Sequence, residues 1–167
     1  MKNIKTLTKL QQTILVLLRF LIGWHLLYEG MVKLLSSGWS SASFLAESNW
    51  ILSGFSSWII SNPGVLNVVD FLNTWGLIAI GAGLILGLFT RIAAISGVLL
   101  LLMYYFNNPP LIGLECSMPS EGNYLIVSKI LIEAVALFVL VVFPTGTIAG
   151  LDILVNRFLY RKNKKEV

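Results

Sequence analysis

Four ionisable side chains occur within one strongly apolar stretch near the N-terminus. Arg19, His25, Glu29 and Lys33 lie in LLRFLIGWHLLYEGMVKLL, residues 17–35, and His25 is the single histidine of the chain. At about 100° per residue, a helix places all four on one arc of about 120°. A face of this kind can donate hydrogen bonds, move protons or bind an electron-rich ligand.

A second ionisable pair, Lys129 and Glu133, stands four residues apart in the apolar run 123–143. An ionised side chain in the middle of a membrane costs about 2.5–3.5 kcal/mol on insertion scales, so we expect these groups to be paired. Pairing of residues four apart within each helix is one arrangement. The alternative is pairing across the two helices, Glu29 with Lys129 or Lys33 with Glu133. The surplus of one cation suits a reduced quinone oxygen or a small oxyanion.

Simpler interpretations of these charges remain open. Arg19 and Lys33 could extend their charged ends toward the two membrane surfaces, and the other groups could only hold helices together. A haem is not expected, because one histidine cannot supply two haem ligands within a subunit. The sequence contains no CxxC, HExxH, phosphate-binding glycine loop or nucleophile elbow, so no metal site is predicted. Cys116, the single cysteine, cannot form an intrachain disulfide and is interpreted as an incidental thiol.

The elements that must position these residues are membrane helices. The chain has 167 residues, of which 56% are hydrophobic and only 12% charged, whereas soluble domains usually have about 25% charged residues. Four segments approach the about 20 apolar residues needed to span a bilayer. They are residues 12–35, 68–88, 90–106 and 123–143. We therefore predict an all-α integral membrane protein, a four-transmembrane-helix bundle forming a single membrane domain over 1–167.

The distribution of basic residues predicts the orientation of this bundle. Lys and Arg are absent from residues 34–73 and 107–122 and gather at the N-terminus, at Arg91 and in the C-terminal tail. By the positive-inside tendency, both termini and the Arg91 turn are cytoplasmic. The loops 36–67 and 107–122 then face outward. Basic residues confined to the chain ends and one turn indicate topology, so no nucleic-acid partner is expected.

Two further helices are predicted outside the spans. In the first outer loop, Ser43 could cap a short helix at the membrane interface, where tryptophans such as Trp50 are favoured. Asn62 and Pro63 then begin a helix that continues into the second span. The tail 144–167 is predicted to be an amphipathic helix on the cytoplasmic surface.

Small residues recur every fourth position in the second and third spans. Ala79, Gly83 and Gly87 form one such ridge and Ala93 and Gly97 another. Small residues at this spacing let helix backbones approach closely in lipid. The turn containing Arg91 is so short that the two spans must form an antiparallel hairpin.

Several motifs resemble those of the DoxX-like or DoxD-like family of small four-helix inner-membrane proteins. The motifs are the spacing of Arg19, Gly23, Gly30 and Lys33, then GLIAIGAGLILGLFTRIAAISG at 76–97, EGNYLIVSKILIE, and GLD at 150–152. The resemblance implies a location in the bacterial cytoplasmic (inner) membrane. It also implies a link to thiosulfate:quinone oxidoreductase, redox-protecting complexes, cargo receptors or assembly chaperones. The chain departs from many relatives at Asn73-Thr74-Trp75, where an acidic residue often stands.

The resulting hypothesis is a membrane subunit of a quinone-linked oxidoreductase, with quinone as a non-covalent ligand in the outer half of the bundle. Two alternatives remain: a non-enzymatic scaffold, assembly factor or cargo binder, and a small-solute transporter. Candidate partners are the lipid bilayer, a redox or periplasmic protein, and a second copy of the chain. The candidate ligand-binding residues are Arg19, Trp24, His25, Tyr28, Glu29, Lys33, Lys129 and Glu133, with Gly83, Gly87 and Arg91 as structural positions.

Overall fold

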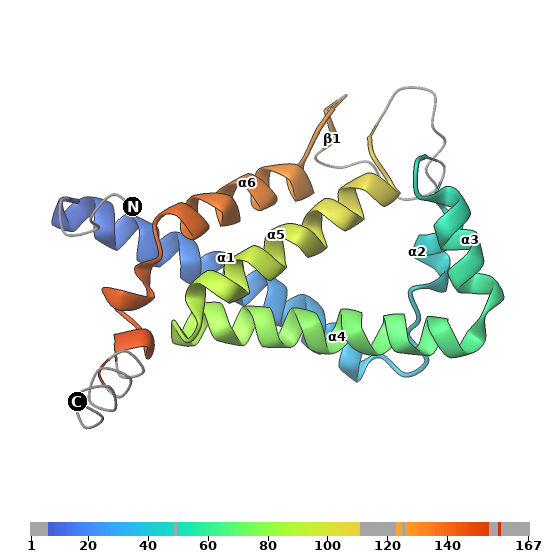
Figure 1. Cartoon of the computed structure of the whole chain (residues 1–167), viewed down its shortest axis with the longest axis horizontal. Coiled ribbons are helices and arrows are strands. Elements are labelled where there is room, and N and C mark those ends of the chain that lie inside the picture. Colours follow the sequence, from blue (N-terminus) through green and yellow to red (C-terminus); the bar gives the residue numbers. More distant parts are fainter. Residues whose placement is uncertain (1–6, 49, 111–122, 125, 154–156, 158–167) are drawn as a thin grey trace, which may run out of the picture.

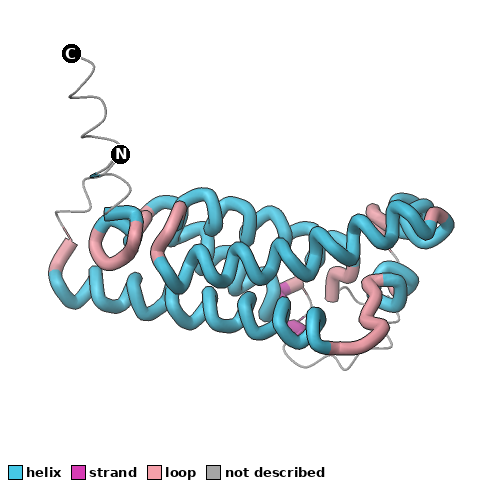
Figure 2. The backbone as a smooth tube through the Cα atoms, turned by 90° about the horizontal axis from the view of Figure 1, so that it is seen from below, coloured by secondary structure: helices cyan, strands magenta, loops and turns pink. Residues whose placement is uncertain are grey.

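The bundle of the computed structural model is built from four helices that lie side by side (Figures 1 and 2). The structure describes residues 7–48, 50–110, 123–124, 126–153 and 157. The elements are α1 (Lys9–Leu35), α2 (Ala42–Ala46), α3 (Ser53–Ser61), α4 (Pro63–Leu86), α5 (Thr90–Asn107), β1 (Asn123–Tyr124), β2 (Val127–Ser128), α6 (Lys129–Val142) and the 3₁₀ turn η2 (Thr145–Thr147). Helices α2 and α3 lie across one end of the bundle, and η2 lies at the other (Figure 1).

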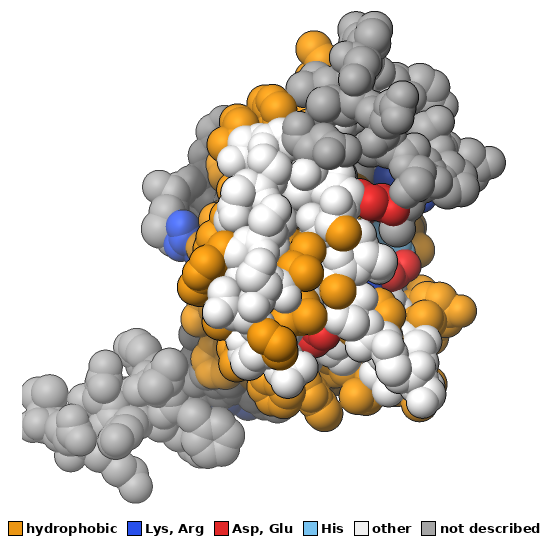
Figure 3. All heavy atoms as spheres, turned by 90° about the vertical axis from the view of Figure 1, so that its right-hand side faces the viewer, with side chains coloured by type: hydrophobic (Ala, Val, Ile, Leu, Met, Phe, Trp, Pro, Cys, Tyr) orange, Lys and Arg blue, Asp and Glu red, His pale blue; other side chains and the backbone are white. Residues whose placement is uncertain are grey.

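Three helices, α1, α4 and α5, are long and apolar enough to cross a membrane. Many of their large apolar side chains are exposed, as expected for helices that face lipid. Seen from the end that carries α2 and α3, hydrophobic side chains gather around the edges of the molecule (Figure 3). The protein is therefore a mostly helical membrane protein, as predicted from composition.

The fourth span was predicted to begin at residue 123, but the helix begins later. Residues 123–124 and 127–128 form an antiparallel pair of strands, and α6 begins only at Lys129. Ser128 caps α6, since its side chain accepts a hydrogen bond from the Leu131 amide. With 14 residues, α6 is about 21 Å long at 1.5 Å per residue, against a hydrocarbon core of about 30 Å. Four full spans are therefore not established by the helices described.

The boundaries of α4 and α5 agree with the sequence prediction in two respects. Asn62 occupies the N-cap position of α4 and Pro63 its first turn, and α5 covers the segment predicted as the third span. The turn between them is tight. Gly87 ends α4 with φ 64° and Phe89 follows with φ 48°, so both adopt the left-handed conformation.

Residues 36–67, predicted to be an outward-facing loop, contain two short helices where the sequence predicted one. Ser43 lies inside α2, and Ser41 occupies its N-cap position, so the predicted cap was wrong by two residues. The Asp70 carboxylate on α4 accepts hydrogen bonds from the Ser41 amide (2.8 Å) and hydroxyl (2.5 Å). The side-chain oxygen of Asn107, at the end of α5, accepts one from the Ser56 hydroxyl at 2.7 Å. We call α2 and α3, which lie in the loop predicted to face outward, the outer lid, and this end of the bundle the lid end.

The closest helix contact joins α1 to α4 at glycines. A Cβ added to Gly81 would meet the backbone of Leu27 and lie 2.7 Å from the Gly23 carbonyl oxygen. One added to Gly30 would lie 2.7 Å from the Ile78 side chain. The predicted ridges contribute elsewhere: Gly97 lies against α6, and Gly83 packs on the α4–α5 turn. The tightest approach thus uses glycines that the fourfold pattern did not select.

The predicted amphipathic helix at the C-terminus falls mainly outside the described residues. In the described part of the tail, η2 is followed by a bend, and Asp152, Ile153 and Arg157 are helical. Cys116 and most of the loop 107–122 also lie outside the described residues.

Candidate functional site

Arg19 lies at the end of the bundle opposite the outer lid. Its side chain is only 4% exposed and donates from Nη1 to Thr145 Oγ1 (3.2 Å) and from Nη2 to the Ala149 carbonyl (2.5 Å). Fourteen residues separate it from Lys33, about 21 Å along α1. The structure therefore excludes Arg19 from the polar cluster that the sequence predicted in the outer half.

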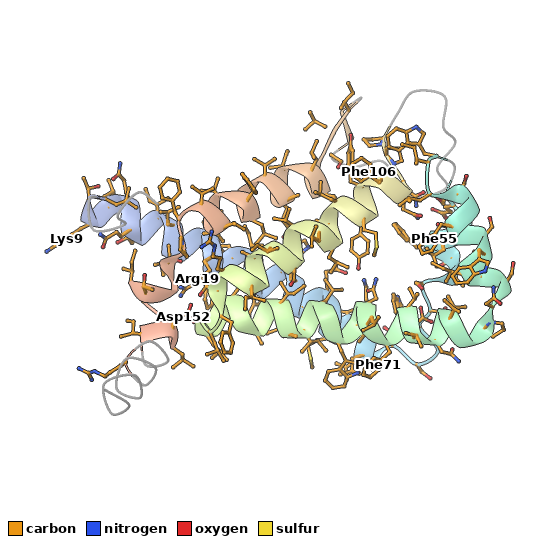
Figure 4. All side chains as sticks on the ribbon, in the orientation of Figure 1. Lys9, Arg19, Phe55, Phe71, Phe106 and Asp152 are labelled. Atoms are coloured by element: carbon orange, nitrogen blue, oxygen red, sulfur yellow. The ribbon has the colours of Figure 1, made fainter. Side chains whose placement is uncertain are left out.

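Asp152 closes the same end of the bundle. Its carboxylate accepts hydrogen bonds from the amides of Phe89 (2.6 Å), at the N-cap position of α5, and of Thr90 (3.1 Å), the first residue of α5. The Asp152 amide donates to the Gly87 carbonyl at 2.9 Å, and Arg19 and Asp152 lie close together at this end (Figure 4). We call residues 144–152 the C-terminal latch, and this end the latch end. Here the GLD motif has a structural role as the cap of the α4–α5 turn.

In the part of the chain that the structure describes, one contact joins a basic side chain of α1 to an acidic side chain of α6. His25 Nδ1 of α1 lies 2.8 Å from Glu133 Oε1 of α6, with the histidine side chain 54% exposed and the glutamate side chain 15% exposed. The sequence predicted contact between these two segments but paired their lysines and glutamates. Within the described residues, none of those four lysine–glutamate pairs is formed as an ion pair.

The other candidate residues of α1 and α6 are exposed. Glu29 and Lys129 lie one turn from His25 and Glu133 toward the lid end, and both are exposed. Trp24 and Tyr28 are 56% and 58% exposed. The structure therefore does not place these aromatic rings around an enclosed ligand site.

A polar cavity of about 270 Å³ lies under the outer lid. It is lined by Glu29, Lys33, Trp39, Ser40, Ser41, Ser43, Phe44, Asn73 and Tyr104. Lys33 is the basic residue of this lining. Its Nζ donates a hydrogen bond to Asn73 Oδ1 at 2.9 Å. The ammonium also lies 5.0 Å from the centre of the Trp39 ring and 5.4 Å from that of Tyr104. These cation–π contacts hold the ammonium at the wall of the cavity.

Tyr104 also lines this cavity. Its hydroxyl is buried beside the Asn73 side chain and has no hydrogen-bond partner within 3.5 Å among the described residues. The ring packs edge-on against Phe44 of the outer lid, at a centroid distance of 5.6 Å. Buried polar atoms are normally hydrogen-bonded, and an exception calls for an explanation such as a ligand or an ordered water.

An apolar cavity of about 270 Å³ adjoins the polar one. The two share Ser41, Phe44, Asn73 and Tyr104. The remaining wall of the apolar cavity is mainly aliphatic and aromatic, from both helices of the outer lid and from α4 and α5. Those residues are Leu45, Leu52, Phe55, Ser56, Ile59, Val69, Leu72, Leu100, Met103 and Asn107. The two cavities therefore differ in character, since one is lined by polar and charged groups and the other mainly by apolar side chains.

Sequence reasoning identified Lys33 and Glu29 but missed Asn73, Tyr104 and Trp39. Asn73 follows Asp70 by three residues, so a polar stripe at the start of α4 was a usable signal. Tyr104 lies in an apolar run where nothing distinguishes its hydroxyl from that of Tyr105. Within the part of the chain that the structure describes, no group of three His, Cys, Asp or Glu residues is placed to hold a metal ion.

Three long apolar helices packed with a shorter one define an all-α membrane protein. Residues 14–107, more than half of the chain, match the family model described as DoxX. The chain belongs to the DoxX family, as its motifs indicated. The matched region runs from α1 to the end of α5 and contains the whole lining of both cavities. Comparison with curated proteins and with solved structures gave no match.

Proposed function

We propose that the protein binds a quinone in the two cavities under the outer lid, as a membrane subunit of a quinone-linked redox complex. One observation carries the proposal. The Lys33 ammonium and the Tyr104 side chain line a polar cavity, and an apolar cavity shares four lining residues with it. A quinone is likewise part polar and part apolar, because it has carbonyl oxygens on its ring and a long apolar chain.

The polar cavity supports the recognition of a quinone ring. Lys33 has three N–H donors, of which one is directed at Asn73, and Tyr104 has one O–H donor. A quinone carbonyl is an acceptor, and its charge grows during reduction, so a cation and a hydroxyl favour the reduced forms.

The apolar cavity supports a long-chain ligand taken from the bilayer. Ligand sites are mostly apolar, with few polar groups that fix orientation. The isoprenoid chain would lie between the outer lid and α4 and α5, beside Phe55 and Leu72. Electrons would be exchanged with a partner protein, as implied by relatives associated with thiosulfate:quinone oxidoreductase.

The proposal includes a location and orientation. We infer a bacterial inner membrane, with the latch end cytoplasmic, because the basic residues flank α1 and the α4–α5 turn at that end. The cavities then lie toward the outer surface. In this arrangement α6 is a fourth crossing segment that is shorter than the hydrocarbon core, and local thinning of the bilayer accommodates it.

Replacing Tyr104 by Phe tests the role of the hydroxyl. The change should leave the melting temperature of the ligand-free protein equal or higher, because a buried unpaired hydroxyl destabilises the fold. Affinity for decylubiquinone should fall about tenfold, the equivalent of one lost hydrogen bond. Both quantities are measured on purified protein in lipid nanodiscs, by thermal unfolding and by equilibrium titration.

Tyr105→Phe is the matched control. The Tyr105 hydroxyl donates to the Ile126 carbonyl at 2.7 Å and does not line either cavity. This variant should melt at a lower temperature and keep the affinity of the wild-type protein. Equal affinity of wild type and Tyr104→Phe would remove the hydroxyl from the proposed site, and no binding by wild type would contradict the function itself.

A further inference from the structure

The faces of α1 and α6 carry exposed charges at membrane depth. With the middle of α1 taken as the centre of the hydrocarbon core, His25 lies about 5 Å and Glu29 about 11 Å from that centre toward the lid end, at about 1.5 Å per residue. Both distances are less than the about 15 Å from the centre of the hydrocarbon core to its edge. Exposed ionisable groups at this depth are costly unless another polar surface covers them.

Glu29 and Lys129 lie at the same depth. Helices α1 and α6 run in opposite directions, and the His25–Glu133 contact fixes their register. Glu29 and Lys129 are each four residues beyond that contact toward the lid end, about 6 Å along each helix. Among the described residues, neither side chain takes part in a hydrogen bond or an ion pair within 4.0 Å.

We propose that a second copy of the chain covers this face, with Glu29 of each protomer paired to Lys129 of the other. A twofold axis along the membrane normal keeps every residue at its own depth. It therefore brings the α1 face of one copy to the α6 face of the other. The opposite charges at one depth make the face self-complementary, which is what an isologous interface requires.

The surroundings of the charged pair suit a helix-packing interface within a membrane. Exposed apolar side chains flank it on both helices. They are Leu21, Tyr28, Val32, Ile132 and Val135. Burial of these side chains around a desolvated ion pair would exclude lipid and water from the charges. The dimer would also cover the exposed His25 imidazole, which already has Glu133 as its partner.

Charge reversal in separately tagged full-length copies tests the dimer. Two wild-type copies with different peptide tags, expressed together and extracted in native-membrane discs, should co-purify. Recovery should fall about tenfold when both copies carry Glu29→Lys, or both carry Lys129→Glu, because like charges then meet across the interface. Lys9→Glu, a charge reversal at the exposed start of the same helix, should leave recovery unchanged.

The decisive arm combines one copy carrying Glu29→Lys with one carrying Lys129→Glu. In a twofold dimer both contacts are then opposite in charge, so recovery should return to the wild-type level. Pairing of Glu29 with Lys129 inside one chain predicts no such return, since each single chain still carries two like charges. A wild-type protein that does not co-purify with itself, or a mixed pair that fails to recover, would overturn the dimer. Co-purification does not depend on quinone binding, so the two proposals fail separately.

Discussion

Gly81→Ala is expected to lower the free energy of unfolding by about 1–3 kcal/mol, the usual cost of overpacking a close contact. The added methyl group would meet the backbone of Leu27 and lie 2.7 Å from the Gly23 carbonyl oxygen. Backbone atoms of a helix cannot rotate away as a flexible side chain can, so α1 and α4 must separate. Reversible unfolding in mixed micelles, followed by circular dichroism, measures the loss.

Gly76→Ala on the same helix is the control. No atom lies within 4 Å of a Cβ at this position. Alanine is about 1 kcal/mol more favourable than glycine inside a helix, so this variant should be as stable as wild type or more stable. Equal stability of the two variants would show that the α1–α4 crossing is looser than described.

Arg19→Met should also be strongly destabilising. Arg19 is buried and donates to Thr145 and Ala149 of the C-terminal latch. A hydrogen bond to a charged group contributes about 1.5–3 kcal/mol, and loss of both should release the latch from the turn. Hydrogen exchange of the Phe89 and Thr90 amides, which donate to Asp152, should rise while that of the outer lid stays constant.

Arg91→Met provides the comparison for this variant. Arg91 is exposed in the first turn of α5, so its loss should change neither the melting temperature nor the exchange of the two amides. If Arg19→Met behaves as Arg91→Met does, the latch is not held by the guanidinium group.

Much of the fold follows from patterns in the sequence. Long apolar runs predict α1, α4 and α5, and Pro63 predicts the start of α4, because these signals are local. The predicted start of α6 was wrong. The apolar run continues through residues 123–128, but the backbone there pairs as two short strands. A two-residue strand depends on its partner and has no periodicity of its own.

The candidate site was predictable only in part. Helical periodicity shows on which side of its helix a residue lies, but not which residue of another helix it contacts. Arg19 shares an arc with Lys33, but the two lie fourteen residues apart along α1, and the Arg19 side chain bonds to the latch at the other end of the bundle. Lys33 contacts Asn73 of α4 rather than α6, because glycines bring α1 and α4 together. Partners of this kind depend on helix crossing, which the sequence of one helix does not specify.

A density map of the protein extracted with its native lipids tests the quinone proposal most directly. We predict a planar ring in the polar cavity, with an oxygen about 3 Å from Lys33 Nζ or Tyr104 Oη. Its chain should continue into the apolar cavity between the outer lid and α4 and α5, and quinone should be present in the organic extract of the same sample. Cavities filled only by water or a phospholipid acyl chain, with no quinone in the extract, would contradict the proposed function.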